Sequence, residues 1–219
     1  IATDGTSYGG AIYNGGTITF GREAIFENNV AEATKEDATG GAIYNYGLIT
    51  FMDNVRFSNN TALGADLAGG AAISNSGQIY FNGGETIFEN NNASGRRGEL
   101  GGVIKNSGDI EFNNKVTFVG NKTASGGGAV IDNASGSVTF TKDSFVTIVN
   151  NTGAIDVSDN GIVKFEGDFI FSGNNIKGLE PYYGKGKDIY NFFYKLLAKI
   201  FNFISNKNKG IYLQTFLCV

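Results

Sequence analysis

Apolar and polar residues alternate along most of the chain, in short runs that recur in a fixed order. The period within each run is two residues, which is the period of a β-strand. Asparagine, glycine and β-branched residues dominate these runs, whereas a helix would need better helix formers and a period near 3.6 residues. The pattern therefore predicts strands, and it persists to residue 176.

Three short motifs make up the pattern. The first is a Gly-Gly segment that leads to an isoleucine and, two places later, an asparagine: Ile12 and Asn14, Ile43 and Asn45, Ile73 and Asn75, Ile104 and Asn106, Ile131 and Asn133. The second is Ile/Val-x-Phe, which ends at Phe20, Phe51, Phe81, Phe112, Phe140 and Phe165. The third is Phe-x-x-Asn, found at Phe26 and Asn29, Phe57 and Asn60, Phe88 and Asn91, Phe118 and Asn121, and Phe171 and Asn174. Ile148 and Asn151 replace it in the fifth copy.

The spacing of the motifs predicts a solenoid. The phenylalanines of the second motif are 31, 30, 31, 28 and 25 residues apart, and a fixed period of 20–50 residues is typical of repeat architectures. Three strands per repeat, separated by glycine or asparagine, predict a coil with three faces. We expect an all-β fold, a right-handed parallel β-helix of about six three-strand coils of ~30 residues, over residues 1–176.

Stacked coils give each motif residue a structural role. Equivalent residues of neighbouring coils lie on top of one another, so the inward isoleucines and phenylalanines are expected to form the core. The motif asparagines are expected to form hydrogen-bonded ladders, because a side-chain amide both donates and accepts. Glycine suits the corners, since it tolerates backbone angles that residues with a Cβ atom avoid.

The repeat stops at Ile176. Residues 177–187 have the glycine, proline and charge content of a linker. Residues 188–219 begin with a helix-like pattern, in which a polar stripe of asparagine and lysine interrupts a wide apolar face. We predict a C-terminal amphipathic helix there. It either caps the last coil or lies in a membrane interface through residues 188–204.

Charge and composition exclude some functions. The 219 residues carry a net charge of −4, and the repeat region holds 10 basic and 19 acidic residues, which argues against nucleic acid as a partner. Histidine is absent, which removes the commonest general base and metal ligand. Cys218 is the single cysteine, so no intrachain disulfide or cysteine-based zinc site is expected.

Asp156, Ser158 and Asn160 have the spacing of calcium ligands, but the final acid of such a loop is missing. No cofactor or metal is predicted.

The alternation of the Gly-Gly-Ala-Ile/Val and Phe-x-x-Asn motifs over residues 9–175 resembles the repeat pair of the chlamydial polymorphic membrane proteins. That family consists of large autotransported surface proteins with β-helical passengers, and several members are adhesins. The resemblance implies an extracellular or cell-surface location associated with the outer membrane. It also implies binding rather than catalysis, so no enzymatic activity is expected.

The segments that join the third motif to the next Gly-Gly vary in length and are expected to be loops along one edge: residues 30–39, 61–68, 92–100 and 122–126. Solenoids usually bind through such loops. Arg96 and Arg97 are the candidate binding residues, because the chain has few arginines and an acidic protein or a glycan would contact them. A solvated loop without a ligand is the alternative.

The leading function is therefore an adhesin or structural rod that binds a protein receptor, matrix component or glycan on a cell surface. The alternative is a carbohydrate-active β-helix of the polysaccharide lyase or hydrolase kind, because enzymes share this fold. Its candidate acids are Asp109, Glu111 and Glu85, which are otherwise a solvated face. A spacer without a ligand is a third hypothesis. The enzyme requires outward acids and bases that converge in a groove with perturbed pKa values.

Overall fold

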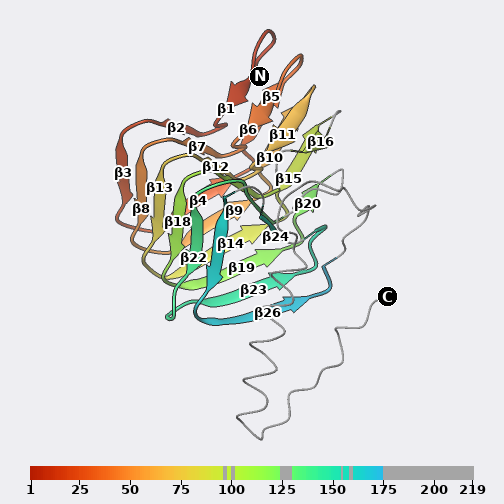
Figure 1. Cartoon of the computed structure of the whole chain (residues 1–219). Helices are drawn as coiled ribbons and strands as arrows, with labels where there is room; N and C mark the ends of the chain where they lie inside the picture. The colour runs from red at the N-terminus through yellow and green to blue at the C-terminus, as the bar shows by residue number, and fades with distance from the viewer. Residues whose placement is uncertain (96–97, 100–101, 124–129, 154, 158–159, 175–219) are drawn as a thin grey trace, which may run out of the picture.

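The computed structural model describes residues 1–95, 98–99, 102–123, 130–153, 155–157 and 160–174. Over these residues the chain is an all-β solenoid in which every paired strand is parallel to its neighbours (Figure 1). The predicted parallel β-helix is therefore confirmed, and its handedness stays a prediction. The strands form five sheets, which we name A to E.

Three sheets of six strands surround the main core. Sheet C contains β2 (Ile12–Asn14), β7 (Ile43–Asn45), β12 (Ile73–Asn75), β17 (Ile104–Asn106), β21 (Ile131–Asn133) and β24 (Ile155–Val157). Sheet D contains β3 (Thr17–Phe20), β8 (Leu48–Phe51), β13 (Gln78–Phe81), β18 (Asp109–Phe112), β22 (Ser137–Phe140) and β25 (Ile162–Phe165). Sheet E contains β4 (Ala24–Glu27), β9 (Val55–Ser58), β14 (Glu85–Glu89), β19 (Lys115–Val119), β23 (Phe145–Val149) and β26 (Asp168–Ser172).

Two sheets of four short strands project to one side of this body, at the upper right of Figure 1. Sheet A contains β5 (Val30–Ala33), β10 (Thr61–Gly64), β15 (Asn92–Gly95) and β20 (Lys122–Thr123). Sheet B contains β1 (Ser7–Tyr8), β6 (Ala38–Thr39), β11 (Leu67–Gly69) and β16 (Gly98–Glu99). We call sheets A and B together the alanine lobe. Its core is a separate cluster of small side chains: Ala31, Ala33, Ala38, Ala62 and Ala68.

The alanine lobe corrects the expectation of three-strand coils. The segments 30–39 and 61–68 were expected to be loops, and they instead hold the strands β5, β6, β10 and β11. Alanine alternates with polar residues in these segments, and only a side chain as small as alanine lets the two sheets approach closely. Four turns therefore have five strands each, and two further turns are described in sheets C, D and E alone. The total of about six coils stays a prediction, because residues 124–129, 154 and 158–159 lie outside the described residues.

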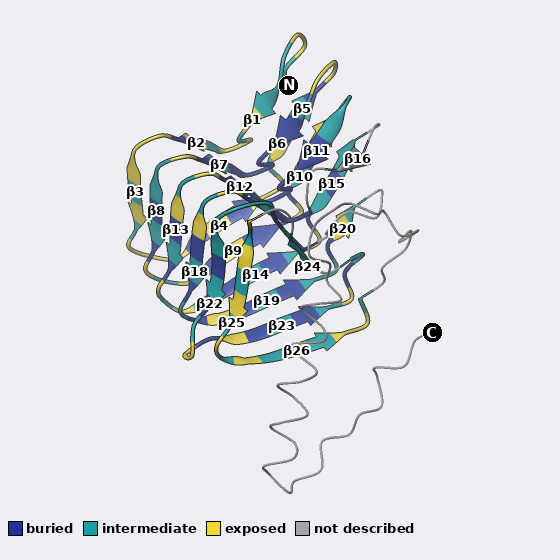
Figure 2. Cartoon of the chain, in the orientation of Figure 1, coloured by how far each residue is buried: buried dark blue, intermediate teal, exposed yellow. Residues whose placement is uncertain are grey.

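The main core consists of the isoleucines and phenylalanines that the motifs place inward. Equivalent phenylalanines stack in two columns, with ring centroids 5.0 Å apart for Phe51 and Phe81 and 4.9 Å apart for Phe57 and Phe88. The two columns meet edge to face, as between Phe51 and Phe57 at 6.1 Å. The inward positions of the middle turns are buried (Figure 2). Each such side chain contributes about 1.5–3 kcal/mol when it is fully buried.

The core residues of the outermost turns are less covered than those of the middle turns. Ile12, Phe20, Phe165 and Phe171 are partly buried and pack against the same cluster as their counterparts in the middle turns. Each of these residues has an equivalent on one side only, because a solenoid turn contacts its neighbours alone.

The motif asparagines form two ladders, as the sequence predicts. The first ladder lies at the end of sheet C and runs from Asn14 to Asn133. In it, each asparagine Nδ2 donates to the Oδ1 of the asparagine in the next turn, and these bonds are 2.6–2.8 Å long. The second ladder lies beyond sheet E and runs from Asn29 to Asn174. Its bonds between successive asparagine side chains are 2.9–3.0 Å long. In this second ladder the backbone N–H of one asparagine also donates to the next side chain, as from Asn60 to Asn91 at 2.9 Å.

The residue before each asparagine of the second ladder turns the corner with a left-handed backbone. Asn28, Asn59, Asn90 and Asn150 have φ between 52° and 56°, and Gly120 and Gly173 occupy the same position in the other turns. Asparagine and glycine are the residues that adopt this region most readily. This requirement explains the Asn-Asn and Gly-Asn pairs that end the third motif.

The C-terminal predictions lie outside the described residues. The linker at 177–187, the amphipathic helix and the cap or membrane-interface segment at 188–219 all fall there, and so does the boundary at residue 176. The described residues contain no helix. No helix long and apolar enough to cross a membrane was found among them.

Candidate ligand-binding groove

One outward position of the first motif forms a row of unlike side chains along sheet C. The first and third residues of each strand point inward, isoleucine and asparagine in β2 to β21 and Ile155 and Val157 in β24, so the residue between them points outward. Backbone pairing places these residues in register, and from β2 to β24 they are Tyr13, Tyr44, Ser74, Lys105, Asp132 and Asp156. The row therefore begins with aromatic rings and ends with charged groups.

A groove of about 240 Å³ runs between this row and the alanine lobe. Sheet B forms one wall with Tyr8, Ala38 and Thr39, and sheet C forms the other with Tyr44 and Lys105. The remaining lining residues are mostly small or hydroxylated, and they include Thr6, Asp37, Ser74, Ser76 and Ser107. The groove exists only because the connecting segments fold into strands, since a three-strand coil has no second wall.

A cluster of tyrosines lies at the first-turn end of the groove. The rings of Tyr8 and Tyr44 meet edge to face with centroids 4.7 Å apart, and Tyr13 stacks on Tyr44 at 5.3 Å and 9°. Tyr46 packs against the edge of Tyr13, also at 5.3 Å. Tyr8 is 46% exposed although it packs on Tyr44, so the groove keeps an accessible aromatic surface. Burial, together with the nearby phenols of Tyr8 and Tyr46, raises the pKa of Tyr44.

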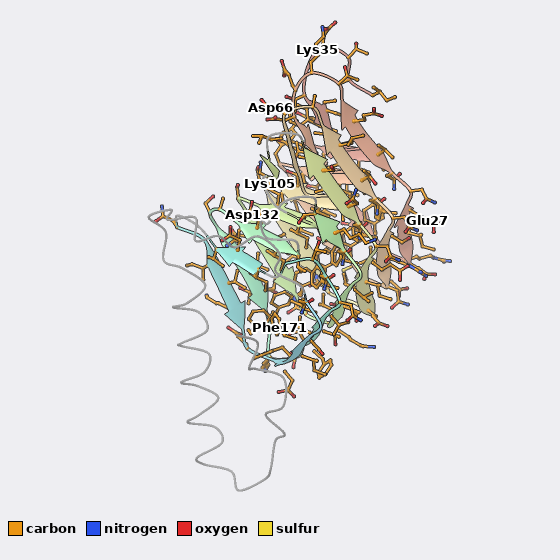
Figure 3. All side chains as sticks on the ribbon, turned by 90° about the vertical axis from the view of Figure 1, so that its right-hand side faces the viewer. Glu27, Lys35, Asp66, Lys105, Asp132 and Phe171 are labelled. Carbon is orange, nitrogen blue, oxygen red and sulfur yellow. The ribbon has the colours of Figure 1, made fainter. Side chains whose placement is uncertain are left out.

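Lys105 and Asp132 occupy paired positions on β17 and β21. Figure 3 shows them on the same side of the molecule, with Glu27 on the opposite side of that view. Both side chains are half-buried. Within the described residues, neither forms a hydrogen bond or an ion pair. A half-buried charged group without a close partner is costly in a folded protein, which makes the pair a candidate for contact with a ligand.

The environment shifts the two pKa values in opposite directions. Burial lowers the pKa of Lys105, and the carboxylates of Asp132 and Asp37 partly offset this effect. Burial, and to a smaller extent the carboxylate of Asp156 on β24, raises the pKa of Asp132 to about 6, although Lys105 opposes the rise. Both groups are therefore more easily neutralised than they are in water.

Thr39 adds an unsatisfied polar group to the wall of the groove. Its side chain is nine-tenths buried, and its Oγ1 has no hydrogen-bond partner among the described residues. Buried hydroxyls are normally hydrogen-bonded, so this hydroxyl is an unusual feature of the wall. No group of three or more acidic, histidine or cysteine side chains that could hold a metal occurs in the described part of the chain.

The candidate acids named from the sequence lie away from this groove. Arg96 and Arg97 lie outside the described residues. Asp109 accepts hydrogen bonds from the Ser137 backbone N–H and hydroxyl at 3.1 and 2.7 Å, and Glu111 accepts from Asn113 Nδ2 at 2.7 Å.

Glu85, the third candidate acid, pairs with Lys115 at 2.8 Å. Asp109, Glu111 and Glu85 thus have partners outside the groove, and none of them lines it. Their role in the enzyme hypothesis stays a prediction.

Sequence reasoning missed Tyr8, Tyr44, Lys105 and Asp132. The signal for three of them was present, because each is the variable residue between the isoleucine and asparagine of the first motif. The residue type at that position varies along the chain. Its importance depends on sheet B, the second wall of the groove, and the sequence predicted loops where much of that wall lies.

A family model of the Chlamydia polymorphic membrane protein repeat matches residues 23–46. This stretch runs from β4 to β7 and contains one Phe-x-x-Asn motif and the following Gly-Gly motif. The match confirms the resemblance to this repeat for one copy of the pattern. No curated protein and no solved structure matches the chain significantly.

Proposed function

We propose that this chain is a surface-exposed β-helix that acts as a non-enzymatic adhesin and binds a cell-surface partner in the groove between sheets B and C. The polymorphic membrane protein repeat and the parallel solenoid suggest a passenger of the autotransporter type at the cell surface. Outer-membrane association follows from the same resemblance.

The observation that carries the proposal is the groove itself. It combines an accessible aromatic surface at Tyr8 with the ammonium of Lys105, which has no ion-pair partner among the described residues, on a scaffold whose turns are joined by the asparagine ladders. Aromatic anchors beside a few directional polar groups are typical of binding sites on preformed scaffolds. Arg96 and Arg97 stay a proposal for a second contact with an acidic protein or a glycan.

The experiment is saturable binding of the fluorescently labelled full chain to cultured epithelial cells. We expect Tyr8→Ala to weaken binding by about tenfold, because losing an interfacial aromatic typically costs over 1 kcal/mol. Tyr80→Ala on sheet D is the matched control and should change it by less than about twofold.

A second variant, in which Arg96 and Arg97 are both changed to alanine, tests the second contact separately. Weaker binding by that variant alone would move the site to the third connecting segment. Absence of saturable binding by the unmodified chain would reduce the protein to a structural rod.

A carbohydrate-active enzyme is the second candidate function, and a specific observation favours it. Asp132 and Asp156 are paired on neighbouring strands, about 4.8 Å apart along the sheet, and Asp132 has a raised pKa. A carboxyl of raised pKa with a second carboxyl on the next strand, beside a lysine of lowered pKa, is an arrangement that acid–base catalysis can use. Release of new reducing ends from a polysaccharide, lost in Asp132→Asn, would support the enzyme. Cell binding without such release would support the adhesin.

A further inference from the structure

We infer that the groove between sheets B and C is a binding site for a neutral saccharide. This inference rests on the proposed function, because it names the chemical class of the partner that the adhesin would recognise. Three features of the groove carry it: an aromatic wall, a wall of hydroxyls with an unsatisfied member, and a charge balance that disfavours acidic sugars.

The aromatic wall offers a surface for the apolar face of a sugar ring. Tyr8 lines the groove, and its edge-to-face contact with Tyr44 fixes its orientation without covering it. Tyrosine supplies a large contact area at a low cost in conformational entropy. A polar groove with an aromatic ring at one end suits a ring-shaped ligand that has one apolar face and a polar rim.

The polar groups suit hydroxyls, which both donate and accept hydrogen bonds. Lys105 can only donate, an ionised Asp132 can only accept, and neither has a partner in the described residues. A sugar hydroxyl in the groove can accept from Lys105, which lines it, whereas Asp132 lies on the adjacent strand β21 next to the lining residues. Thr39 belongs to the facing wall, and its buried Oγ1 has no hydrogen-bond partner among the described residues.

The charge balance selects a neutral ligand. The carboxylates of Asp132 and Asp37 both act on the single ammonium of Lys105, and Asp156 acts on Asp132 in turn. A uronate or sulfated sugar would bring a further negative charge toward the carboxylates of Asp37 and Asp132. An amino sugar would place a second cation beside Lys105. An uncharged sugar meets neither penalty.

The size of the groove limits how much of the ligand it holds. Its volume of about 240 Å³ is below the about 300–1,000 Å³ of a pocket for a drug-sized molecule. It therefore fits one or two rings of a longer glycan, and the rest of that glycan extends along sheet C or into solvent.

The test is isothermal titration calorimetry of the full chain at pH 7.5. The neutral probes are maltohexaose, cellohexaose, mannohexaose and chitohexaose, and the anionic probes are a galacturonate hexamer and a heparin hexasaccharide. We expect at least one neutral probe to bind and both anionic probes to bind more weakly. Tighter binding of either anionic probe, or no binding of any neutral probe, would overturn the inference.

Variants locate the bound sugar. We expect Tyr8→Ala and Lys105→Met each to weaken binding of the neutral probe by about tenfold, because each removes one strong contact. The matched changes Tyr80→Ala and Lys164→Met lie on sheet D, away from the groove, and should change binding by less than about twofold. Equal losses in the groove variants and in the sheet D variants would place the sugar elsewhere and contradict the inference.

The cell-binding experiment separates this inference from the proposed function. Cell binding that depends on Tyr8, without binding of any neutral probe, would refute the saccharide and keep the adhesin. Binding of a neutral probe that depends on Tyr8, without any cell binding, would refute the adhesin and keep the saccharide site.

Discussion

Lys105 and Asp132 lie side by side in register on β17 and β21, yet no ion pair or hydrogen bond joins them. In a repeat whose inward residues are nearly identical from turn to turn, the outward residues are free to vary, and here they place opposite charges next to each other at a groove. The stability of the protein should therefore be sensitive to the protonation of Asp132.

Stability should fall as the pH rises from about 4 to about 6. The pKa of Asp132 is about 6 in the folded protein against an ordinary value of 3.8, because burial and Asp156 outweigh Lys105. The folded state therefore holds the proton more tightly than the unfolded state. The stabilisation is fully present below pH 3.8 and is lost as the pH passes through about 6.

The measurement is urea unfolding at a series of pH values. Asp132→Asn should remove the part of the pH-dependent fall in stability that Asp132 causes. The variant should be about 1–2 kcal/mol more stable than the unmodified chain at pH 7.5, after allowance for the partial exposure of Asp132. Lys105, Asp37 and Asp156 remain in that variant and provide the background. Asp168→Asn on sheet E is the matched control. Identical pH profiles for the unmodified chain and Asp132→Asn would contradict the assignment.

Breaking an asparagine ladder should be expensive. Asn91 Oδ1 accepts bonds from the backbone N–H and the Nδ2 of Asn60, and its own Nδ2 donates to Phe57 O and to Asn121 Oδ1, all within 3.0 Å. Asn91→Ala leaves buried groups on both neighbouring turns without partners. We expect a loss of about 2–4 kcal/mol in the free energy of unfolding, measured by chemical denaturation.

The exposed Asn82 provides the comparison for this variant. Asn82→Ala should cost less than about 0.5 kcal/mol, because its bond to Asn113 is exposed to water. Equal costs for the two variants would mean that the ladder contributes nothing beyond an ordinary surface amide.

The corner before the second ladder should tolerate glycine and reject alanine. Asn59 is exposed and has φ of 55°, so its backbone conformation, and not its burial, determines the residue. We expect Asn59→Ala to cost about 1 kcal/mol, because an L-residue with a Cβ is strained there, and Asn59→Gly to be nearly neutral. Thermal unfolding of the two variants checks this. A more stable alanine variant would contradict the strain argument.

The alanine lobe should not accept a larger side chain. Ala62 on β10 is fully buried between sheets A and B. Ala62→Leu should therefore cost about 1–3 kcal/mol by overpacking. The neighbouring Leu63 points outward and is 40% exposed, so Leu63→Ala should have little effect. Stability measurements in which both variants behave alike would indicate that residues 61–68 are a solvated loop, as the sequence reading expected.

The main core could be predicted because its determinants repeat. Phe51, Phe81 and Phe112 recur at nearly constant spacing, so their identity alone places them in one column. The asparagine ladders followed from the same recurrence. The alanine lobe could not be predicted in this way, because its strands have two to four residues and their small side chains resemble loop composition.

The groove was missed for a related physical reason. Lys105 and Asp132 are conspicuous only once sheet B stands beside sheet C, and the position of that second wall depends on the alanine lobe. Outward residues of a solenoid do not need to match from turn to turn, so their chemistry follows no period that a sequence pattern can reveal.

The most direct test of the groove compares two triple variants in the cell-binding assay. The first carries Tyr8→Ala, Lys105→Met and Asp132→Asn, and the second carries the same chemical changes on sheets D and E, at Tyr80, Lys164 and Asp168. Both are checked for cooperative unfolding before use. The groove hypothesis predicts that the first variant loses saturable binding and that the second retains it. Retention of binding by the first variant, or its loss by both, would contradict the assignment of this groove as the binding site.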